Sequence, residues 1–186
     1  MSFSPAKEEE EAGITAFQVQ EAHAELGVVM VNGSRVLWFR ANGVGAPSDI
    51  VRSIPAAWGQ EGVRLQLQAI NFTHYAFSAG PMGGIGGEEG MMQVALVDNA
   101  LMSMSFSGTF AGIYATTNTA SNSSVSGGTP AYFGNWTYQG MGQAIDDGEY
   151  YPSNTGPTVP EPGDGVAAGA GGAGWFGWGK RGGWGW

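Results

Sequence analysis

The sequence feature that most constrains the fold is a regular alternation of apolar and polar residues over residues 63–70. In the segment Val63-Arg-Leu-Gln-Leu-Gln-Ala-Ile70 every odd-numbered position is apolar, and positions 64, 66 and 68 are polar. Because successive side chains of a β-strand point to opposite faces, this period predicts a strand that is buried on one face. Such a strand needs a second layer over its apolar face, so the chain must form a sheet packed against another element.

Turn signals join this strand and others into hairpins. Residues 26–31 and 35–40 are rich in Val, Leu, Trp and Phe, and they flank Asn32-Gly33, the strongest short-range signal for a two-residue hairpin turn. The strand over 63–70 is predicted to return through a turn at 71–74 into a strand at 75–78. Further strands are predicted, between Gly-rich or Ser/Thr/Asn-rich loops, at 14–20, 93–98, 109–116 and 131–139. Eight strands at this spacing predict an antiparallel β-sandwich or barrel.

Composition and charge narrow the function classes. Glycine supplies 33 of the 186 residues and only 12% of residues are charged, which is typical of an all-β chain with many tight turns. The formal net charge of -9 repels a phosphate backbone, so we expect no nucleic-acid partner. The acidic run Glu8–Glu11 is interpreted as a solvated segment. No stretch approaches the roughly 18 apolar residues that cross a bilayer, so we expect no membrane partner.

Few signals in the sequence bear on the compartment. The chain has no cysteine, which removes disulfides, thiol catalysis and thiolate metal sites. Its first residues contain no apolar core of a secretory signal, so the localisation stays open on the sequence alone. The frequency of Asn-x-Ser/Thr sequons favours a secreted lineage. The four candidate N-glycosylation sites are Asn32, Asn71, Asn122 and Asn135.

The composition changes after Tyr151. A stretch rich in Pro, Ser and Thr leads into Gly/Ala repeats, and four of the seven tryptophans fall in the last twelve residues. Such a segment has no periodic apolar face with which to join a core. We therefore predict one domain over residues 1–152 and a disordered Pro/Gly/Trp-rich tail over 153–186.

No arrangement of residues predicts catalysis. Glycoside hydrolysis needs two carboxyl groups that face each other across about 5 to 9.5 Å. The acidic neighbours Glu88-Glu89 and Asp146-Asp147 instead point to opposite faces of an extended chain. His23 and His74 lack metal-ligand spacing, and no Gly-x-Ser-x-Gly elbow occurs. We expect no catalytic residue, no metal and no cofactor in this chain.

Tryptophans of the predicted domain are candidates for a sugar-stacking platform. The candidates are Trp38, Trp58 and Trp136. In the predicted strand 131–139, Trp136 shares a face with Tyr132 and Tyr138, which favours core packing for it. Trp58 follows a Ser-Ile-Pro-Ala-Ala loop and is the better candidate for contact with a ligand. These candidates do not establish which residues bind carbohydrate, so the carbohydrate-binding residues stay unknown.

Several strings, taken in order, carry a family resemblance. They are Glu10-Glu-Ala-Gly-Ile-Thr-Ala-Phe17, Ala24-Glu-Leu-Gly-Val28, Val63-Arg-Leu-Gln-Leu67, Asn71-Phe-Thr-His-Tyr-Ala-Phe-Ser78, Phe110-Ala-Gly-Ile-Tyr-Ala-Thr116, and Thr129-Pro-Ala-Tyr-Phe133 with Asn135-Trp-Thr-Tyr138. Together they resemble the C-terminal concanavalin A-like domain of fungal glycoside hydrolase family 43 enzymes, the β-xylosidases and α-L-arabinofuranosidases, over residues 3–152. The resemblance implies a concanavalin A-like, jelly-roll type antiparallel β-sandwich.

The functional expectations come from the resemblance and not from the residue pattern. In such enzymes the catalytic carboxylates lie on an N-terminal β-propeller, which this chain does not contain, so none of them is carried over to a residue here. The resemblance implies two partners, a catalytic propeller domain or chain and a xylan-type polysaccharide, and a secreted parent family. The family usually has further strands before the segment similar to residues 3–13, so we expect an N-terminally truncated sandwich with an uncovered sheet edge.

Three hypotheses about function follow. The leading one is a non-catalytic accessory domain of a family 43 type glycoside hydrolase acting on xylan or arabinoxylan, which packs on the propeller and helps to shape its substrate pocket. The alternative is a free-standing lectin-like carbohydrate-binding module, because sandwiches often serve as such scaffolds. The third is a glycosidase with an unrecognised site, and the sequence leaves open whether the chain is an enzyme.

Overall fold

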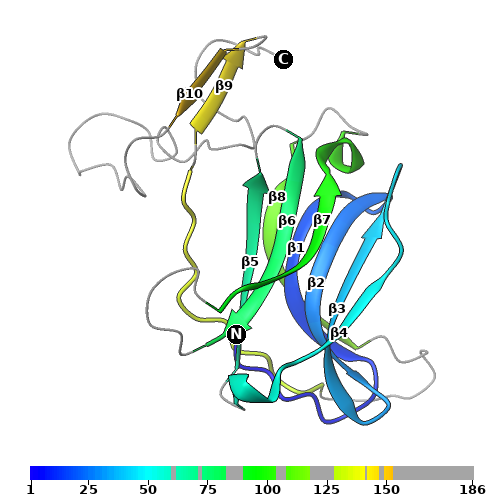
Figure 1. The fold of residues 1–186 in the computed structure, drawn as a ribbon. Helices are drawn as coiled ribbons and strands as arrows, with labels where there is room; N and C mark the ends of the chain where they lie inside the picture. The colour runs from blue at the N-terminus through cyan, green and yellow to red at the C-terminus, as the bar shows by residue number, and fades with distance from the viewer. Residues whose placement is uncertain are drawn as a thin grey trace. The chain divides into compact units, whose positions relative to one another are not determined.

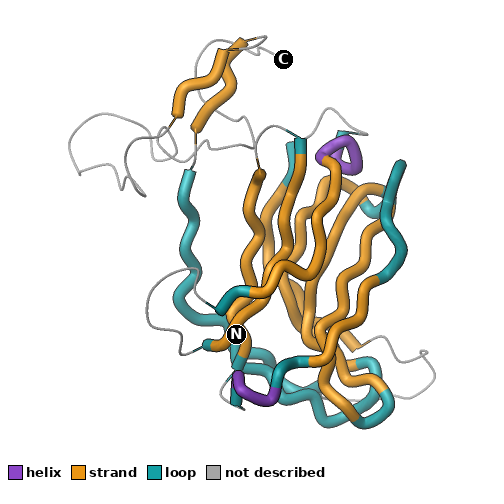
Figure 2. The backbone as a smooth tube through the Cα atoms, in the orientation of Figure 1, coloured by secondary structure: helices purple, strands orange, loops and turns teal. Residues whose placement is uncertain are grey.

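The regular secondary structure of the described residues is almost entirely β-strand (Figures 1 and 2). The computed structural model describes residues 1–59, 62–70, 73–82, 90–103, 108–117, 128–140, 142–146 and 149–152. The chain divides into two units, Met1–Gly134 and Asn135–Trp186. The described helices are two short 3-10 turns, η1 (Ala56–Trp58) and η2 (Asn99–Met102), and none of the described helices is long and apolar enough to span a membrane.

The larger sheet of the first unit has five strands in the order β4-β3-β2-β1-β8. All of its neighbours are antiparallel. The turn between β2 and β3 is the predicted Asn32-Gly33 pair, which adopts φ of 50° and 72°. Both values lie in the left-handed region that Asn and Gly tolerate best, as a tight hairpin requires. The strands are β1 (Glu10–Val19), β2 (Ala22–Val31), β3 (Ser34–Asn42), β4 (Ile50–Ser53) and β8 (Phe110–Thr117).

The smaller sheet has three antiparallel strands in the order β5-β6-β7. These strands are β5 (Val63–Ile70), β6 (His74–Pro81) and β7 (Met92–Asp98). At the end of β7, the side chain of Asp98 accepts a hydrogen bond of 2.8 Å from the backbone N–H of Ala100 and caps η2.

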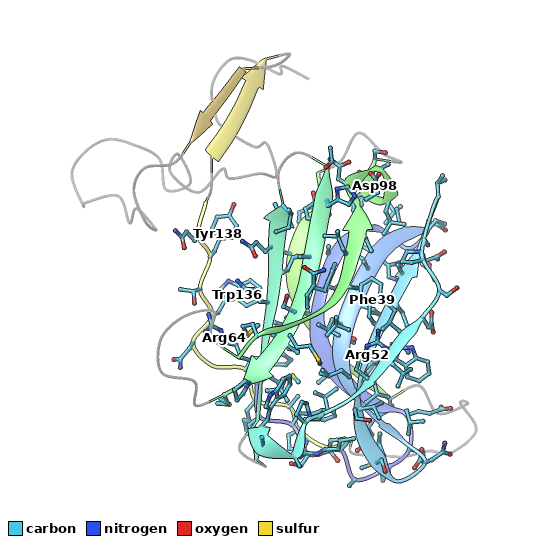
Figure 3. The ribbon with its side chains drawn as sticks, in the orientation of Figure 1. Phe39, Arg52, Arg64, Asp98, Trp136 and Tyr138 are labelled. Atoms are coloured by element: carbon cyan, nitrogen blue, oxygen red, sulfur yellow. The ribbon has the colours of Figure 1, made fainter. Side chains whose placement is uncertain are left out.

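The two sheets pack face to face and enclose the hydrophobic core (Figures 1 and 3). Strand β5 packs against β1, and β7 lies near β4. Phe39 of the larger sheet meets Phe77 of the smaller sheet with ring centroids 5.1 Å apart, and both side chains are fully buried. Other buried residues of the two facing surfaces are Ala12, Ile14, Ala16, Ala24, Leu26, Val28, Leu37, Tyr75, Ala79 and Val97.

The described strands of the second unit form one antiparallel hairpin. It consists of β9 (Gly142–Asp146) and β10 (Glu149–Pro152). Residues 135–140, which precede it, contain neither a strand nor a helix.

The sandwich predicted from the sequence is confirmed, and most predicted strands are present within a few residues. Strand β1 begins at Glu10 and not at residue 14, and the short edge strand β4 was not predicted. The strand predicted at 131–139 is wrong, because that segment forms only an isolated bridge between Tyr132 and Ser2. The turn at 71–74 lies partly outside the described residues, and the tail over 153–186 lies wholly outside them.

The Phe39–Phe77 contact yields a first prediction. Truncating Phe77 to alanine leaves a cavity between the sheets, so we expect the free energy of unfolding to fall by about 3 to 5 kcal/mol. Leu96→Ala on β7 is the matched control, because Leu96 is 47% exposed and its truncation opens no cavity. Urea unfolding curves measure both changes, and equal losses for the two variants would contradict the assigned core.

Candidate functional site

The strand register sorts the residues of the larger sheet onto two faces. Leu26 of β2 lies opposite Phe39 of β3 and faces the core. The next pair, Glu25 and Arg40, therefore lies on the outer face, away from the smaller sheet. Register partners on β1 and β8 place Glu11 and Tyr114 on this same outer face.

Two paired glycines form the floor on which these polar side chains lie. Gly13 of β1 is the register partner of both Gly27 and Tyr114. A Cβ atom on Gly27 would stand 2.6 Å from the Tyr114 hydroxyl and 3.0 Å from Oε1 of Glu11. A side chain at Gly27 would therefore displace both groups, so glycine is required at this position.

Glu11 is the centre of a buried polar network. Its carboxylate is fully buried and accepts hydrogen bonds from the Tyr114 hydroxyl and the Arg40 guanidinium. Arg40 also donates from Nε to Oε1 of Glu25 over 2.8 Å and forms ion pairs with both carboxylates. The network thus connects β8, β1, β3 and β2 across the outer face.

The network sets the protonation of its members. Burial raises the pKa of Glu11, while the hydrogen bond from Tyr114 and the charge of Arg40 act in the opposite direction. Burial lowers the pKa of Arg40, but the charges of Glu11 and Glu25 outweigh it and raise that pKa overall. Burial and the charge of Glu11 raise the pKa of Tyr114 far above its usual value, so its hydroxyl remains a donor.

Trp38 lies next to this network on β3. Its indole N–H donates to Oδ2 of Asp49 over 3.0 Å, and the Arg40 guanidinium carbon lies 5.1 Å from the Trp38 ring centroid. A cation at this distance from the ring is attracted to its π face. The Trp38 ring, one of the three candidate sugar platforms, is therefore half-buried and already in contact with a cation of its own chain.

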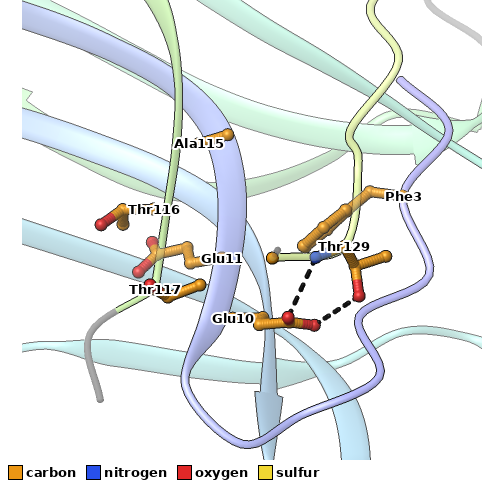
Figure 4. A pocket seen from close by; sticks show the side chains of 8 residues that line it. Phe3, Glu10, Glu11, Ala115, Thr116, Thr117 and Thr129 are labelled. Atoms are coloured by element: carbon orange, nitrogen blue, oxygen red, sulfur yellow. Dashed lines mark hydrogen bonds between the residues drawn. The ribbon is translucent and has the colours of Figure 1, made fainter. Parts of the chain in front are cut away.

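Glu10 points the other way and forms a second polar cluster, of which the bonds to Thr129 are drawn in Figure 4. Its carboxylate accepts hydrogen bonds from the backbone N–H groups of Ala6, Lys7 and Thr129 and from the Thr129 hydroxyl, with distances between 2.7 and 3.1 Å. Burial alone would raise the pKa of Glu10, but these donors lower it to about 2. The cluster fastens the residues before β1 to the segment that contains Thr129.

A pocket of about 240 Å³ lies at the ends of β1 and β8, beside Glu10. It is lined by Phe3, Glu10, Glu11, Ala115, Thr116, Thr117, Gly128 and Thr129 (Figure 4). Glu10 and Glu11 are neighbours on one strand and point to opposite faces, so they do not face each other across a substrate. A carboxylate with a pKa of about 2 is also too weak a base to take a proton at neutral pH.

The interpretation of the run Glu8–Glu11 as solvated is therefore wrong for its second half. Glu8 and Glu9 are exposed, and Glu8 accepts hydrogen bonds from the backbone N–H groups of Asn32 and Gly33 at 2.8 and 2.5 Å. Glu10 and Glu11 are buried because β1 begins at Glu10 and carries both side chains into the sheet. The sequence carried no local signal for this burial, because the partners Thr129 and Tyr114 lie more than 100 residues away along the chain.

The other candidate residues are scattered. Tyr132, Trp136 and Tyr138 are 67%, 59% and 37% exposed, so the expectation that Trp136 packs in the core is wrong. Trp58 is half-buried at the end of η1. Among the sequons, Asn32 and Asn135 are exposed, and Asn71 and Asn122 lie outside the described residues.

The candidate acids and histidines do not form a site in the described residues. Glu88, Glu89 and Asp147 lie outside those residues, whereas Asp146 belongs to β9. The His23 ring lies 6.0 Å from the ring of Phe17, and Nδ1 of His74 lies 2.7 Å from the Thr73 hydroxyl. No group of three or more His, Cys, Asp or Glu residues in the described ranges could hold a metal ion.

These features define an antiparallel β-sandwich whose buried acids are engaged by donors of the same chain. Residues 1–139 match the family described as "Beta xylosidase C-terminal Concanavalin A-like domain", a domain of glycoside hydrolase family 43 (GH43). The chain belongs to this family. The resemblance drawn from the sequence is confirmed at this level, and the fungal origin stays a prediction.

Two further comparisons complete this result. No curated protein matches the chain. A solved structure titled "Bacteroides ovatus Xyloglucan PUL GH43B" is similar at 24% sequence identity with a TM-score of 0.49. The similarity covers 62% of this chain and 22% of that one, so this chain spans far less than the whole of the similar protein.

Glu10 gives a prediction about pH. Its pKa in the folded chain is about 2, below the ordinary value of 4.5, so its contribution to stability is complete above pH 4.5 and is lost as the pH falls toward 2. Glu10→Gln should therefore lower stability at pH 7 by about 1 to 3 kcal/mol and flatten the pH dependence in that window. Denaturant unfolding between pH 7 and 2 tests this, with the exposed Glu9→Gln as control. If the free energy of unfolding fell as steeply between pH 4.5 and 2 in Glu10→Gln as in the parent chain, the assigned hydrogen bonds would be contradicted.

The Glu11–Arg40 pair gives a second prediction for this site. Arg40→Met leaves a fully buried carboxylate without its cation, so we expect a loss of about 3 to 5 kcal/mol in the free energy of unfolding. The double variant Glu11→Leu with Arg40→Met removes both charges and should lose markedly less. Arg52→Met on the exposed strand β4 is the matched control. If the double variant were less stable than Arg40→Met alone, the pairing would be refuted.

Proposed function

We propose that this chain is a non-catalytic accessory domain of a GH43 glycoside hydrolase that acts on xylan or arabinoxylan. In this proposal the sandwich packs on a catalytic β-propeller and helps to shape the propeller's substrate pocket. The sequence resemblance implies a secreted parent family, so the working enzyme is proposed to be extracellular, with Asn32 and Asn135 as exposed acceptors for glycans.

The observation that carries the proposal is the family match over residues 1–139, which covers nearly all the described chain. The chemistry of the described residues supports a non-catalytic role. The two fully buried glutamates are each held by donors of the same chain, Glu10 by Thr129 and Glu11 by Arg40 and Tyr114. Neither is available to protonate a glycosidic oxygen or to attack a sugar, as the acid and the nucleophile of a glycosidase must.

The accessory role makes a direct prediction about a chimeric enzyme. A GH43 β-xylosidase propeller whose own C-terminal domain has been removed should be less stable and less active than the parent enzyme. Fusion of this chain behind that propeller should raise its melting temperature and restore kcat/KM on a nitrophenyl xyloside. A fusion carrying Phe77→Ala, which weakens the sandwich itself, is the matched control and should restore less.

The same experiment separates the alternatives. A fusion that is no more stable or active than the bare propeller would contradict the accessory role. Binding isotherms of the separate chain on insoluble xylan and arabinoxylan test the lectin-like alternative. Saturable binding by the separate chain, without any effect in the fusion, would favour a free-standing carbohydrate-binding module.

A further inference from the structure

The hairpin of β2 and β3 turns at a chemically reactive dipeptide. The backbone nitrogen of Gly33 follows directly after the side-chain amide of Asn32, and glycine has no Cβ to shield that nitrogen. Both residues are exposed, and a Cβ atom placed on Gly33 would meet no atom within 4 Å. The dipeptide therefore has the composition and the open surroundings in which an asparagine side chain can close a ring onto its own backbone.

The reaction open to this dipeptide is an intramolecular acyl transfer. The Gly33 nitrogen loses its proton and attacks Cγ of Asn32. A bond between that nitrogen and Cγ closes a succinimide ring as the bond between Cγ and Nδ2 breaks, and ammonia leaves with the proton. Water then opens the ring to give aspartate, or isoaspartate in which the backbone runs through the side chain. Because both reacting groups belong to one dipeptide, the reaction needs no other protein group.

The carboxylate of Glu8 binds the nitrogen that must react. Its Oε1 accepts from the N–H of Gly33 over 2.5 Å, and its Oε2 accepts from the N–H of Asn32 over 2.8 Å. A charge-assisted hydrogen bond of this kind stabilises the protonated nitrogen, so it opposes the proton loss that the attack requires. The two bonds also hold the turn at its φ values of 50° and 72°, which limits the backbone rotation by which the nitrogen could approach Cγ.

A second Asn-Gly pair in the chain has a different arrangement. Asn42-Gly43 lies at the end of β3, at the far end of the same hairpin. There the side-chain Nδ2 of Asn42 donates to the carbonyl of Gln20 over 3.1 Å. At Asn42 the leaving group is bonded, whereas at Asn32 the attacking nitrogen is bonded. The two pairs have the same covalent chemistry, so a difference between their rates reports on the structure around each.

We propose that Asn32 is a site of spontaneous succinimide formation, and that Glu8 protects it by holding the Gly33 nitrogen in its protonated form. The modification changes the fold as well as the chemistry. Isoaspartate adds a backbone atom to a two-residue turn, and either product places a new carboxylate beside Glu8. Conversion at Asn32 therefore loosens the register of β2 against β3, on which both faces of the larger sheet depend.

The test follows both asparagines in the same molecules. The full chain is made in a bacterial cytoplasm, so that Nδ2 of Asn32 carries no glycan, and is incubated folded at neutral pH. Peptide mapping by mass spectrometry measures aspartate and isoaspartate at Asn32 and Asn42 over time. Glu8→Gln removes the charge and one acceptor oxygen, so the rate at Asn32 should rise roughly three- to tenfold. The rate at Asn42 should stay unchanged, and Glu9→Gln, at the exposed neighbour, should change neither rate.

Unfolding provides a second measurement that does not depend on a substitution. Concentrated urea removes the Glu8 hydrogen bonds, so Asn32 should react faster in the unfolded parent chain than in the folded one. The unfolded parent and the unfolded Glu8→Gln variant should react at the same rate. The isoaspartate form, separated from the parent by anion exchange through its added negative charge, should unfold at a lower urea concentration.

Any of three results would overturn this inference. An Asn32 rate that is unchanged or lower in Glu8→Gln would show that the carboxylate does not protect the nitrogen. An equal rise at Asn42 would assign the effect to general opening of the hairpin. Equal rates at Asn32 in the folded and unfolded parent chain would show that the turn gives no protection. None of these measurements contains a propeller or a sugar, so their outcome is independent of the proposed function.

Discussion

The tight turn at Asn32-Gly33 fixes the register of β2 against β3, and both faces of the larger sheet depend on that register. It places Leu26 opposite Phe39 on the inner face, where Phe39 meets Phe77 of the smaller sheet. It also places Glu25 opposite Arg40 on the outer face, where Arg40 reaches Glu11. A slip of one residue would exchange the two faces and bury Arg40 in the core. The carboxylate of Glu8, which accepts from both turn N–H groups, holds the turn that sets this register.

Much of this architecture could be predicted from local sequence patterns. The alternation over 63–70 matches β5 residue for residue, and the Asn-Gly turn matches its hairpin. The Glu25–Arg40 pair also follows from that turn by counting outward along both strands. The burial of Glu10 and Glu11 could not be read in this way, because their partners Thr129 and Tyr114 are more than 100 residues away in the sequence. The wrong strand at 131–139 has a related cause, since an aromatic alternation predicts a strand only where a neighbouring strand pairs with it.

The two buried acids, Glu10 and Glu11, differ from the carboxyl pair of a glycosidase. A glycosidase holds two carboxyl groups in different protonation states on either side of a bond. Here four donors keep Glu10 ionised, whereas Glu11 is ion-paired with Arg40 and accepts a hydrogen bond from the Tyr114 hydroxyl. Both acids therefore stabilise the fold. Glu11 connects β1 to β3 and β8, and Glu10 connects the residues before β1 to the loop segment at Thr129. The family membership and this use of charge agree with a supporting role beside a separate catalytic domain.

The most direct test of the central claim, that the chain itself is non-catalytic, is turnover by the purified chain. Release of 4-nitrophenol from the xyloside and the arabinofuranoside should not exceed the rate in buffer at any pH between 4 and 8. Turnover above that rate, lost in Glu10→Gln or Glu11→Gln variants that remain folded, would contradict the account and identify the acids of the sandwich as a catalytic site.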